Sequence, residues 1–382
     1  MIRTKLAAAF RRRPIAILLA AIAAAALVAT LFVRTSSGKA EADDPAVNYL
    51  PSSAHVFVIQ LENKSYDGTF GPNSPAPYLS QTLRQQGVLL NNYYGIGHNS
   101  LDNYLAQISG QGPNSATQGD CPVYTPFVQT GTAMLGQAIG AGCVYPSNVT
   151  TLADQLTGAG FTWKGYMEDM GTPCNHPAIG AADPTMTAHV GYQYATRHNP
   201  FVYFQSITGS PSCAANDVDL SALKGNLASA ATTANFNFIV PNLCNDGHDA
   251  PCVDGQPGGL KSADAWLKQW VPVIMNSPAF QQDGILMITF DESDGPQADS
   301  SACCGEGPGP NAAQPGLTGP GGGRTGALMV SPFVAPNTWS TTSYNHYSFL
   351  ASMEELFHLP YLGYAGTPGL SRFGLDVYNK GV

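Results

Sequence analysis

The chain has 382 residues, and only 11% of them are charged, with 17 Lys and Arg against 26 Asp and Glu. Seven of those basic residues and one of the acidic residues lie in residues 1–42, so the remainder holds 10 basic and 25 acidic residues, a formal charge of −15. Such a surface repels nucleic acid and anionic membranes at long range, which argues against a nucleic-acid-binding module. An anionic substrate would need a local concentration of positive charge in its binding site, such as a metal ion.

The N-terminal stretch differs from the rest of the chain. Three arginines at 11–13 precede an almost unbroken apolar run from Pro14 to Val33. A basic region followed by an apolar one is typical of a signal peptide, and the run is also long enough to span a bilayer. We therefore expect residues 1–42 to be a signal peptide cleaved after Ala42 or a membrane tether through residues 14–33. Both alternatives predict that residues 43–382 form one domain that is secreted or held on the outer face of the membrane.

All eight cysteines follow this segment, and an even count in an exported chain favours disulfides. Sequence alone does not fix their connectivity. Pairing in sequence order suggests Cys121–Cys143, Cys174–Cys213 and Cys244–Cys252, with the adjacent Cys303 and Cys304 either forming a vicinal bridge or remaining free.

Short apolar runs alternate with amphipathic stretches along the exported part, which predicts an α/β fold. We expect a central, mostly parallel β-sheet flanked by helices, with long Gly- and Pro-rich loops pinned by disulfides. The expected strands are residues 56–59, 88–90, 161–166, 201–204, 236–240, 285–290 and 327–331. The expected helices are residues 78–87, a helix that begins near Ser100, and residues 152–158, 220–231, 262–275 and 346–358.

Polar side chains follow three of these strands. Glu62 and Asn63 come after the first, Asp246 and His248 follow residues 236–240, and Asp291 with Glu292 follows residues 285–290. Ligands in open α/β sheets bind beyond the carboxyl ends of the strands, and carboxylate and amide oxygens suit a hard divalent cation. Taken singly, the first and third groups are equally well explained as polar turns, whereas Asp246, His248 and Asp249 form a denser polar cluster than a turn requires.

Ser100 lies between a glycine-containing loop and a helix, so it has two interpretations. Serine is a preferred N-cap residue, and a helix N-terminus also favours a phosphoryl group held on a nucleophile. A hydroxyl near a cation could attack phosphorus, and histidines could protonate the leaving alkoxide or bind phosphoryl oxygens. The whole set predicts metal-assisted phosphoryl transfer through a covalent serine intermediate.

Six short blocks follow one another along the exported part: Glu62-Asn-Lys-Ser-Tyr-Asp, His98-Asn-Ser-Leu-Asp-Asn-Tyr, Arg197-His-Asn-Pro-Phe, Pro241-Asn-Leu-Cys-Asn-Asp-Gly-His-Asp, Thr289-Phe-Asp-Glu and Tyr344-Asn-His-Tyr-Ser. In this order they resemble the blocks of the phosphoesterase family of bacterial and fungal acid phosphatases and phospholipases C. Asn99 and Asp102 depart from the family pattern, where prolines are common.

The resemblance implies an alkaline-phosphatase-like fold for the catalytic domain 43–382 and a role for each matching residue. Ser100 would be the nucleophile, and Asn103 would contact a substrate oxygen. Three histidines would take catalytic roles: His198, His248 and His346. One divalent ion, Ca²⁺, Mg²⁺ or Mn²⁺, would be held by Glu62, Asn63, Ser100, Asp291 and Glu292.

Phospholipases C of this family tend to carry an extra C-terminal region, whereas this chain stops soon after His358. We therefore expect an acid phosphatase that acts on small phosphate esters, with no protein partner. A phospholipase C or other phosphodiesterase is the alternative. A non-catalytic binding protein on the same scaffold is a more remote one.

Overall fold

The computed structural model describes residues 50–51 and 55–380, which belong to one compact unit. The predictions made for residues 1–42, including the cleavage site and the tether at 14–33, fall outside the described residues. Within the described part, none of the helices combines the length and the apolar character needed to cross a membrane.

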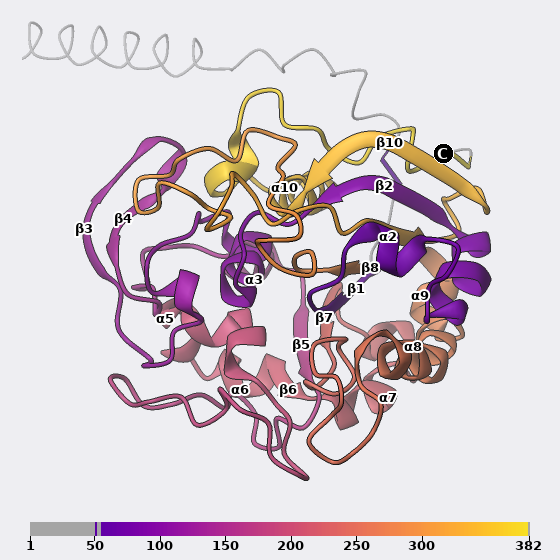
Figure 1. Cartoon of the computed structure of the whole chain (residues 1–382), viewed down its shortest axis with the longest axis horizontal. Coiled ribbons are helices and arrows are strands. Elements are labelled where there is room, and N and C mark those ends of the chain that lie inside the picture. Colours follow the sequence, from indigo (N-terminus) through magenta and orange to yellow (C-terminus); the bar gives the residue numbers. More distant parts are fainter. Residues whose placement is uncertain (1–49, 52–54, 381–382) are drawn as a thin grey trace, which may run out of the picture. The chain divides into compact units, whose positions relative to one another are not determined.

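An eight-stranded sheet organises the unit, in the order β10-β2-β9-β8-β1-β7-β5-β6 (Figure 1). Strand β9 pairs antiparallel with β2 and β8, and the other pairs are parallel. This confirms the predicted α/β class. The strands are β1 (His55–Leu61), β2 (Val88–Tyr94), β5 (Trp163–Met167), β6 (Asp217–Asp219), β7 (Phe236–Val240), β8 (Gly284–Phe290), β9 (Ala327–Val330) and β10 (Thr338–Asn345). A separate antiparallel hairpin joins β3 (Val128–Thr132) to β4 (Ala138–Ala141).

Helices cover both faces of this sheet. Alternate residues of β1 belong to two different cores, because successive side chains of a strand point to opposite faces. Val56 and Val58 pack in one core with α3, α4 and α10, and Phe57 and Ile59 pack in the other with α8 and α9. The helices are α2 (Tyr66–Phe70), α3 (Ser100–Ser109), α4 (Leu152–Gly158), α5 (Gln205–Thr208), α6 (Ser212–Asn216), α7 (Leu223–Asn226), α8 (Gly259–Met275), α9 (Pro278–Asp283) and α10 (His346–Leu356).

Three predicted elements differ from the structure, and two of the differences have a local cause. Residues 201–204 are not a strand: Pro200–Tyr203 is a 3-10 turn that begins where the Asn199 side chain accepts a hydrogen bond from the Phe201 amide. The helix predicted at 220–231 shrinks to α7 between two 3-10 turns, because Ser229 caps a separate turn at Ala230–Thr232. The helix predicted at 78–87 is a π-helical turn, Tyr78–Leu83, followed by a 3-10 turn, Arg84–Gln86.

The three disulfides suggested by sequence order are present, and Cys303 and Cys304, for which a bridge and free thiols were both left open, form a vicinal bridge. Two of them, Cys121–Cys143 and Cys303–Cys304, lie on the long connections that follow α3 and β8, which were predicted to be pinned in this way. Cys174–Cys213 ties the connection after β5 to α6. The fourth, Cys244–Cys252, closes the short loop that follows β7. Disulfides persist in oxidising compartments, which agrees with an exported domain.

Candidate active site

The site begins where β1 and β8 end side by side. Leu61 pairs with Phe290 in parallel register, so the residues that follow each strand emerge together. The Asn63 amide nitrogen donates to Asp291 Oδ1 at 2.8 Å, and its side-chain amide donates to Glu292 Oε1 at 2.6 Å. Asn63 has a positive φ of 45°, a conformation that asparagine tolerates better than most residues. This turn joins the two acidic strand ends into one polar cluster.

Ser100 is the first residue of α3 and not its cap, which is Asn99. Its hydroxyl donates to Glu62 Oε2 at 2.7 Å, and the side chain is buried. Of the two interpretations of Ser100, the capping role is therefore wrong. The helix N-terminus instead presents the hydroxyl to the carboxylates that follow the sheet.

Burial dominates the electrostatics of these carboxylates. It raises the pKa of Asp291 to about 6 and that of Asp246 to about 7. Burial also raises the pKa of Glu62 well above its usual range, and repulsion from Asp291 and Asp246 raises it further. The pKa of Glu292 is raised well above its usual range by burial and by repulsion from Asp291. Such a concentration of buried acids is unfavourable unless protons or a cation neutralise it.

Three predicted metal ligands each bury an oxygen that has no hydrogen-bond partner among the described residues: Glu62 Oε1, Asn63 Oδ1 and Asp291 Oδ2. Buried polar atoms are normally satisfied, and hard oxygen donors of this kind suit a divalent cation. The residues present therefore fit a metal ion.

Glu292 differs from these three ligands, because neither of its oxygens is among the buried atoms without a partner. Its carboxylate accepts from Asn63, and Oε2 lies 3.4 Å from His98 Nδ1 and 3.5 Å from Asn103 Nδ2. In the described part of the chain, the tightest clusters of acidic, Cys or His ligand atoms lie at three disulfides, whose sulfurs are already bonded. The candidate metal ligands are thus spaced more widely than in these clusters. They also include two neutral groups, the side-chain amide of Asn63 and the hydroxyl of Ser100.

His198 connects this cluster to the end of β7. Its Nε2 lies 3.4 Å from Glu62 Oε2, and its Nδ1 lies 3.3 Å from Asp246 Oδ2. The ring is buried and stacks on Tyr104 with centroids 5.4 Å apart. Burial holds the pKa of His198 well below its usual range, with smaller contributions from Arg197 and His248. The ring therefore lies between two buried carboxylates, Glu62 and Asp246, within reach of both.

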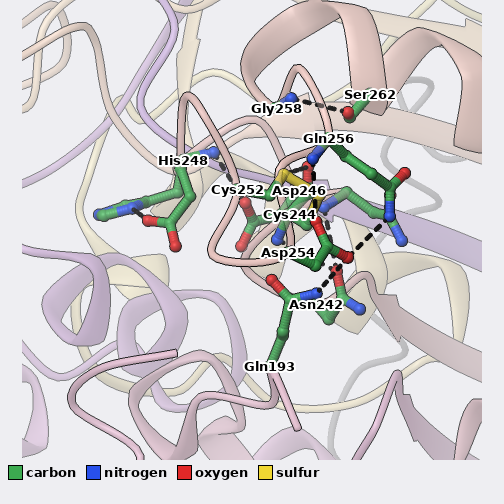
Figure 2. Close-up of a disulfide and its surroundings, with 12 residues drawn as sticks. Gln193, Asn242, Cys244, Asp246, His248, Cys252, Asp254, Gln256, Gly258 and Ser262 are labelled. Atoms are coloured by element: carbon green, nitrogen blue, oxygen red, sulfur yellow. Dashed lines mark hydrogen bonds and ion pairs between the residues drawn. A yellow bond between two sulfur atoms is a disulfide. The ribbon is translucent and has the colours of Figure 1, made fainter. Parts of the chain in front are cut away.

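His248 lies in the loop that follows β7, and its ring centroid is 6.3 Å from that of His198. Figure 2 shows its ring directed away from the disulfide of that loop. Its backbone amide donates to Asp246 Oδ1 at 2.7 Å, and its Nδ1 lies 2.7 Å from Asp249 Oδ1. The hydrogen bond with Asp249 raises the pKa of His248. Unlike His198, this histidine is partly exposed, with 37% of its side chain accessible.

His346 contacts the site through a backbone carbonyl, whereas Asn103 shapes the loop before Ser100 and also lies 3.5 Å from Glu292 Oε2. His346 Nε2 lies 2.6 Å from the Asp291 carbonyl oxygen, while its Nδ1 meets the Tyr93 hydroxyl and the Gln107 amide. Burial lowers the pKa of His346 to about 4, so the ring is neutral and Nε2 donates to the carbonyl. Asn103 accepts from the Ile96 and Gly97 amides and donates to the Gly97 carbonyl, so it shapes the loop before Ser100. Neither contact uses the Asp291 carboxylate or the Ser100 hydroxyl.

Three further residues at the site were not assigned roles from the sequence. His98 lies beside Glu292 and contacts the Asp299 carbonyl at 2.7 Å, and its burial lowers its pKa. Asp246 faces His198, and Tyr104 supports the His198 ring. The signals were present, since His98 and Tyr104 flank Ser100 and Asp246 precedes His248, but strand ends alone do not show which side chains meet.

Comparison with known proteins places this geometry in a family. The model of the phosphoesterase family matches residues 72–360. The chain belongs to the phosphoesterase family. The match covers α3, the 3-10 turn that carries His198, the loop after β7, and the acidic end of β8. The strand β1 and the turn at Glu62 and Asn63 lie just before it.

Several relatives are similar to this phosphoesterase over most of its length. A phosphatidylinositol-3-phosphatase from Mycobacterium tuberculosis is 26% identical over 355 residues, covering 92% of this chain and 93% of that protein. A probable acid phosphatase from Kluyveromyces lactis is 26% identical over 311 residues, and a phosphate-repressible acid phosphatase from Penicillium chrysogenum is 28% identical over 305. Both alignments cover 80% of this chain but only 59% of the relative.

Solved structures with similar folds are more distant. A protein of the alkaline phosphatase superfamily from Vibrio parahaemolyticus superposes with a TM-score of 0.45 at 13% identity, covering 86% of this chain and 74% of that one. The sulfatase PsFucS1 from Pseudoalteromonas gives a TM-score of 0.44 at 12% identity, covering 81% and 70%.

Proposed function

We propose that this phosphoesterase is an exported, metal-dependent phosphomonoesterase of the acid phosphatase type, with Ser100 as its nucleophile. The observation that carries the proposal is the hydrogen bond from the Ser100 hydroxyl to Glu62, at the edge of a cluster of buried carboxylates with unsatisfied oxygens. A hydroxyl in such a place has little structural use, since it does not cap its helix. Its neighbours are those that phosphoryl transfer requires.

The reaction follows from the contacts of these residues. As Ser100 Oγ attacks phosphorus, its proton leaves along the hydrogen bond to Glu62 Oε2, with His198 Nε2 3.4 Å beyond. The bond between phosphorus and the alcohol oxygen breaks, its electron pair stays on that oxygen, which leaves as the alcohol after taking a proton from a histidine of the site, and a phosphoserine remains. When water attacks that phosphoserine, the water gives a proton to the same histidine, phosphate is released, and the proton held by Glu62 returns to Ser100 Oγ. Glu62, Asn63, Ser100, Asp291 and Glu292 would hold a divalent ion, which supplies charge neutralisation for the phosphoryl oxygens when bound.

The relatives support monoester hydrolysis as the first candidate. Three of those named above are phosphatases by name, and one of them aligns over nearly its whole length. A phosphodiesterase or phospholipase C remains the alternative from the family as a whole. Small phosphate esters are the proposed substrates, and the four disulfides support a location outside the cytoplasm.

A direct test uses the disulfide-intact protein with two chromogenic esters, p-nitrophenyl phosphate and p-nitrophenylphosphorylcholine, each with and without a chelator. We expect chelator-sensitive release from the monoester and little from the diester. Faster release from the choline diester would favour the phospholipase C alternative. No release from either ester, with metal retained by the protein, would contradict the proposed activity and favour the binding-protein alternative.

A further inference from the structure

The loop that follows β7 is held more firmly than a turn requires. The Cys244–Cys252 disulfide closes residues 244–252, hereafter the 244–252 loop, which contains Asp246, His248 and Asp249 (Figure 2). The Asn242 side chain accepts from the Cys244 and Asn245 amides and fixes the loop where it leaves the strand. The loop therefore presents its side chains from a rigid base.

The backbone of Asp249 is held by hydrogen bonds at both its amide and its carbonyl. Its amide donates to the Leu243 carbonyl at 3.1 Å, and its carbonyl accepts from the Gly259 amide at 2.8 Å, at the start of α8. Gly258 packs against it so closely that an added Cβ would lie 1.9 Å from the Asp249 carbonyl oxygen. The contacts of its amide and its carbonyl thus fix the backbone of Asp249 and with it the direction of the side chain.

That side chain has one partner among the described residues, the imidazole of His248, with Oδ1 2.7 Å from Nδ1. The other ring nitrogen, Nε2, has no hydrogen-bond partner in the described structure, and the ring is partly exposed beside His198. His198 is different, because both of its nitrogens face buried carboxylates. Of the two histidines, only His248 offers a nitrogen to a group that enters from solvent.

We infer that Asp249 is a positioning residue that orients His248 to protonate the departing alcohol oxygen, an inference that rests on the proposed phosphatase function. As the P–O bond to the alcohol breaks, its electron pair passes to the alcohol oxygen, which takes the proton from His248 Nε2. The neutral imidazole then accepts a proton from the water that attacks the phosphoserine, which restores the starting state. A carboxylate on Nδ1 fixes the ring and supports its protonated form, in line with the raised pKa of His248.

The substrate class follows from this role. An acid at the leaving group matters most for alcohols that leave poorly as anions, and little for nitrophenols. The Asp249–His248 pair therefore marks the site as one for phosphate esters of aliphatic alcohols, such as sugar or glycerol phosphates. A phenyl ester would be hydrolysed without making full use of the pair.

The test measures how the loss of Asp249 depends on the leaving group. With Asp249→Asn, we expect kcat on glycerol phosphate to fall by roughly 10- to 100-fold, and kcat on 2,4-dinitrophenyl phosphate by less than about 3-fold. His248→Gln should show the same dependence, and adding Asp249→Asn to it should cost nothing further. The matched control is Asp254→Asn, since Asp254 bonds only Gln256 and Gln193 near the same disulfide and should leave both rates unchanged.

Two results would overturn the inference. Equal losses on both esters would show that Asp249 only supports the fold of the loop, as would full additivity with His248→Gln. If the wild-type protein hydrolyses neither ester, the proposed function fails and the inference fails with it. If the wild type hydrolyses both and only the leaving-group dependence is missing, the assignment of Asp249 alone is wrong.

Discussion

At the scale of single residues, the Ser100 hydroxyl has one hydrogen-bond partner within the described part of the chain, Glu62. We predict that Ser100→Ala abolishes turnover and leaves the fold intact, because it removes the nucleophile and one hydrogen bond but leaves α3 capped as before. The loss should reach the background of the assay, whereas circular dichroism and melting temperature stay close to wild type. Turnover within about tenfold of wild type would refute the nucleophile assignment.

Asp291 supports a second residue-scale prediction. Its Oδ1 accepts from the Asn63 amide, while Oδ2 is buried and has no hydrogen-bond partner. Asp291→Asn keeps the shape but replaces an anionic donor by a neutral one, so we expect retained metal to fall sharply after dialysis. Metal content measured by mass spectrometry on dialysed wild type and variant decides the matter. Equal content in the two proteins would exclude Asp291 as a metal ligand.

At the scale of elements, helix α10 contains a buried carboxyl group, Glu354, that lies outside the candidate active site. Glu354 is inaccessible to solvent, its Oε1 accepts from the Leu362 amide at 2.8 Å, and its Oε2 has no partner. Burial raises the pKa of Glu354 to about 9. A carboxyl whose pKa is raised by folding contributes stability that is complete below its ordinary pKa. This stability is lost as the pH rises toward 9, by at most about 1.4 kcal/mol per pH unit.

Glu354→Gln should therefore be more stable than wild type at pH 8, by a few kcal/mol at most, and the difference should shrink toward zero near pH 5. Urea unfolding of both proteins at pH 5, 6.5 and 8 measures this difference. The control is Glu355→Gln, because Glu355 is partly exposed and pairs with Arg372. A difference between wild type and Glu354→Gln that does not change with pH would contradict the buried-acid explanation.

Individual strands show where sequence patterns predict the secondary structure correctly and where they do not. Residues 236–240 and 285–290 form central strands that are buried on both faces, so their sequences are almost wholly apolar, interrupted only by Asn237 and Thr289. Strand β10 was missed because it lies at the sheet edge and its sequence is mainly Thr and Ser. Residues 201–204 share the composition of a strand, but Pro200 and the Asn199 side chain bend them into a turn.

The candidate site was predictable to the extent that it depends on strand ends. Parallel register brings Glu62 and Asp291 together, and this follows from two adjacent strands in the sheet. The link from Glu62 through His198 to Asp246 was not predictable, because it joins residues from three distant segments through side-chain packing. The contact of His346 with a backbone carbonyl is also invisible in the sequence, since composition does not show which atom a histidine meets.

At the scale of the whole molecule, the buried carboxylates should link metal binding to stability. Without a cation, Glu62, Asp246 and Asp291 repel one another inside the fold, so an ion that binds only the native state stabilises it by mass action. At a hundred times its dissociation constant, such an ion adds about 2.7 kcal/mol, which corresponds to roughly 5 °C in melting temperature for a protein of this size. We therefore expect a chelator to lower the melting temperature of the wild type by about this amount, and to leave Asp291→Asn nearly unchanged.

Adding back Ca²⁺, Mg²⁺ or Mn²⁺ separately, with melting temperature and turnover read together, should identify the ion that restores both. Equal melting temperatures with and without chelator would contradict the metal site, because the repulsion among these acids would then be relieved by protons alone.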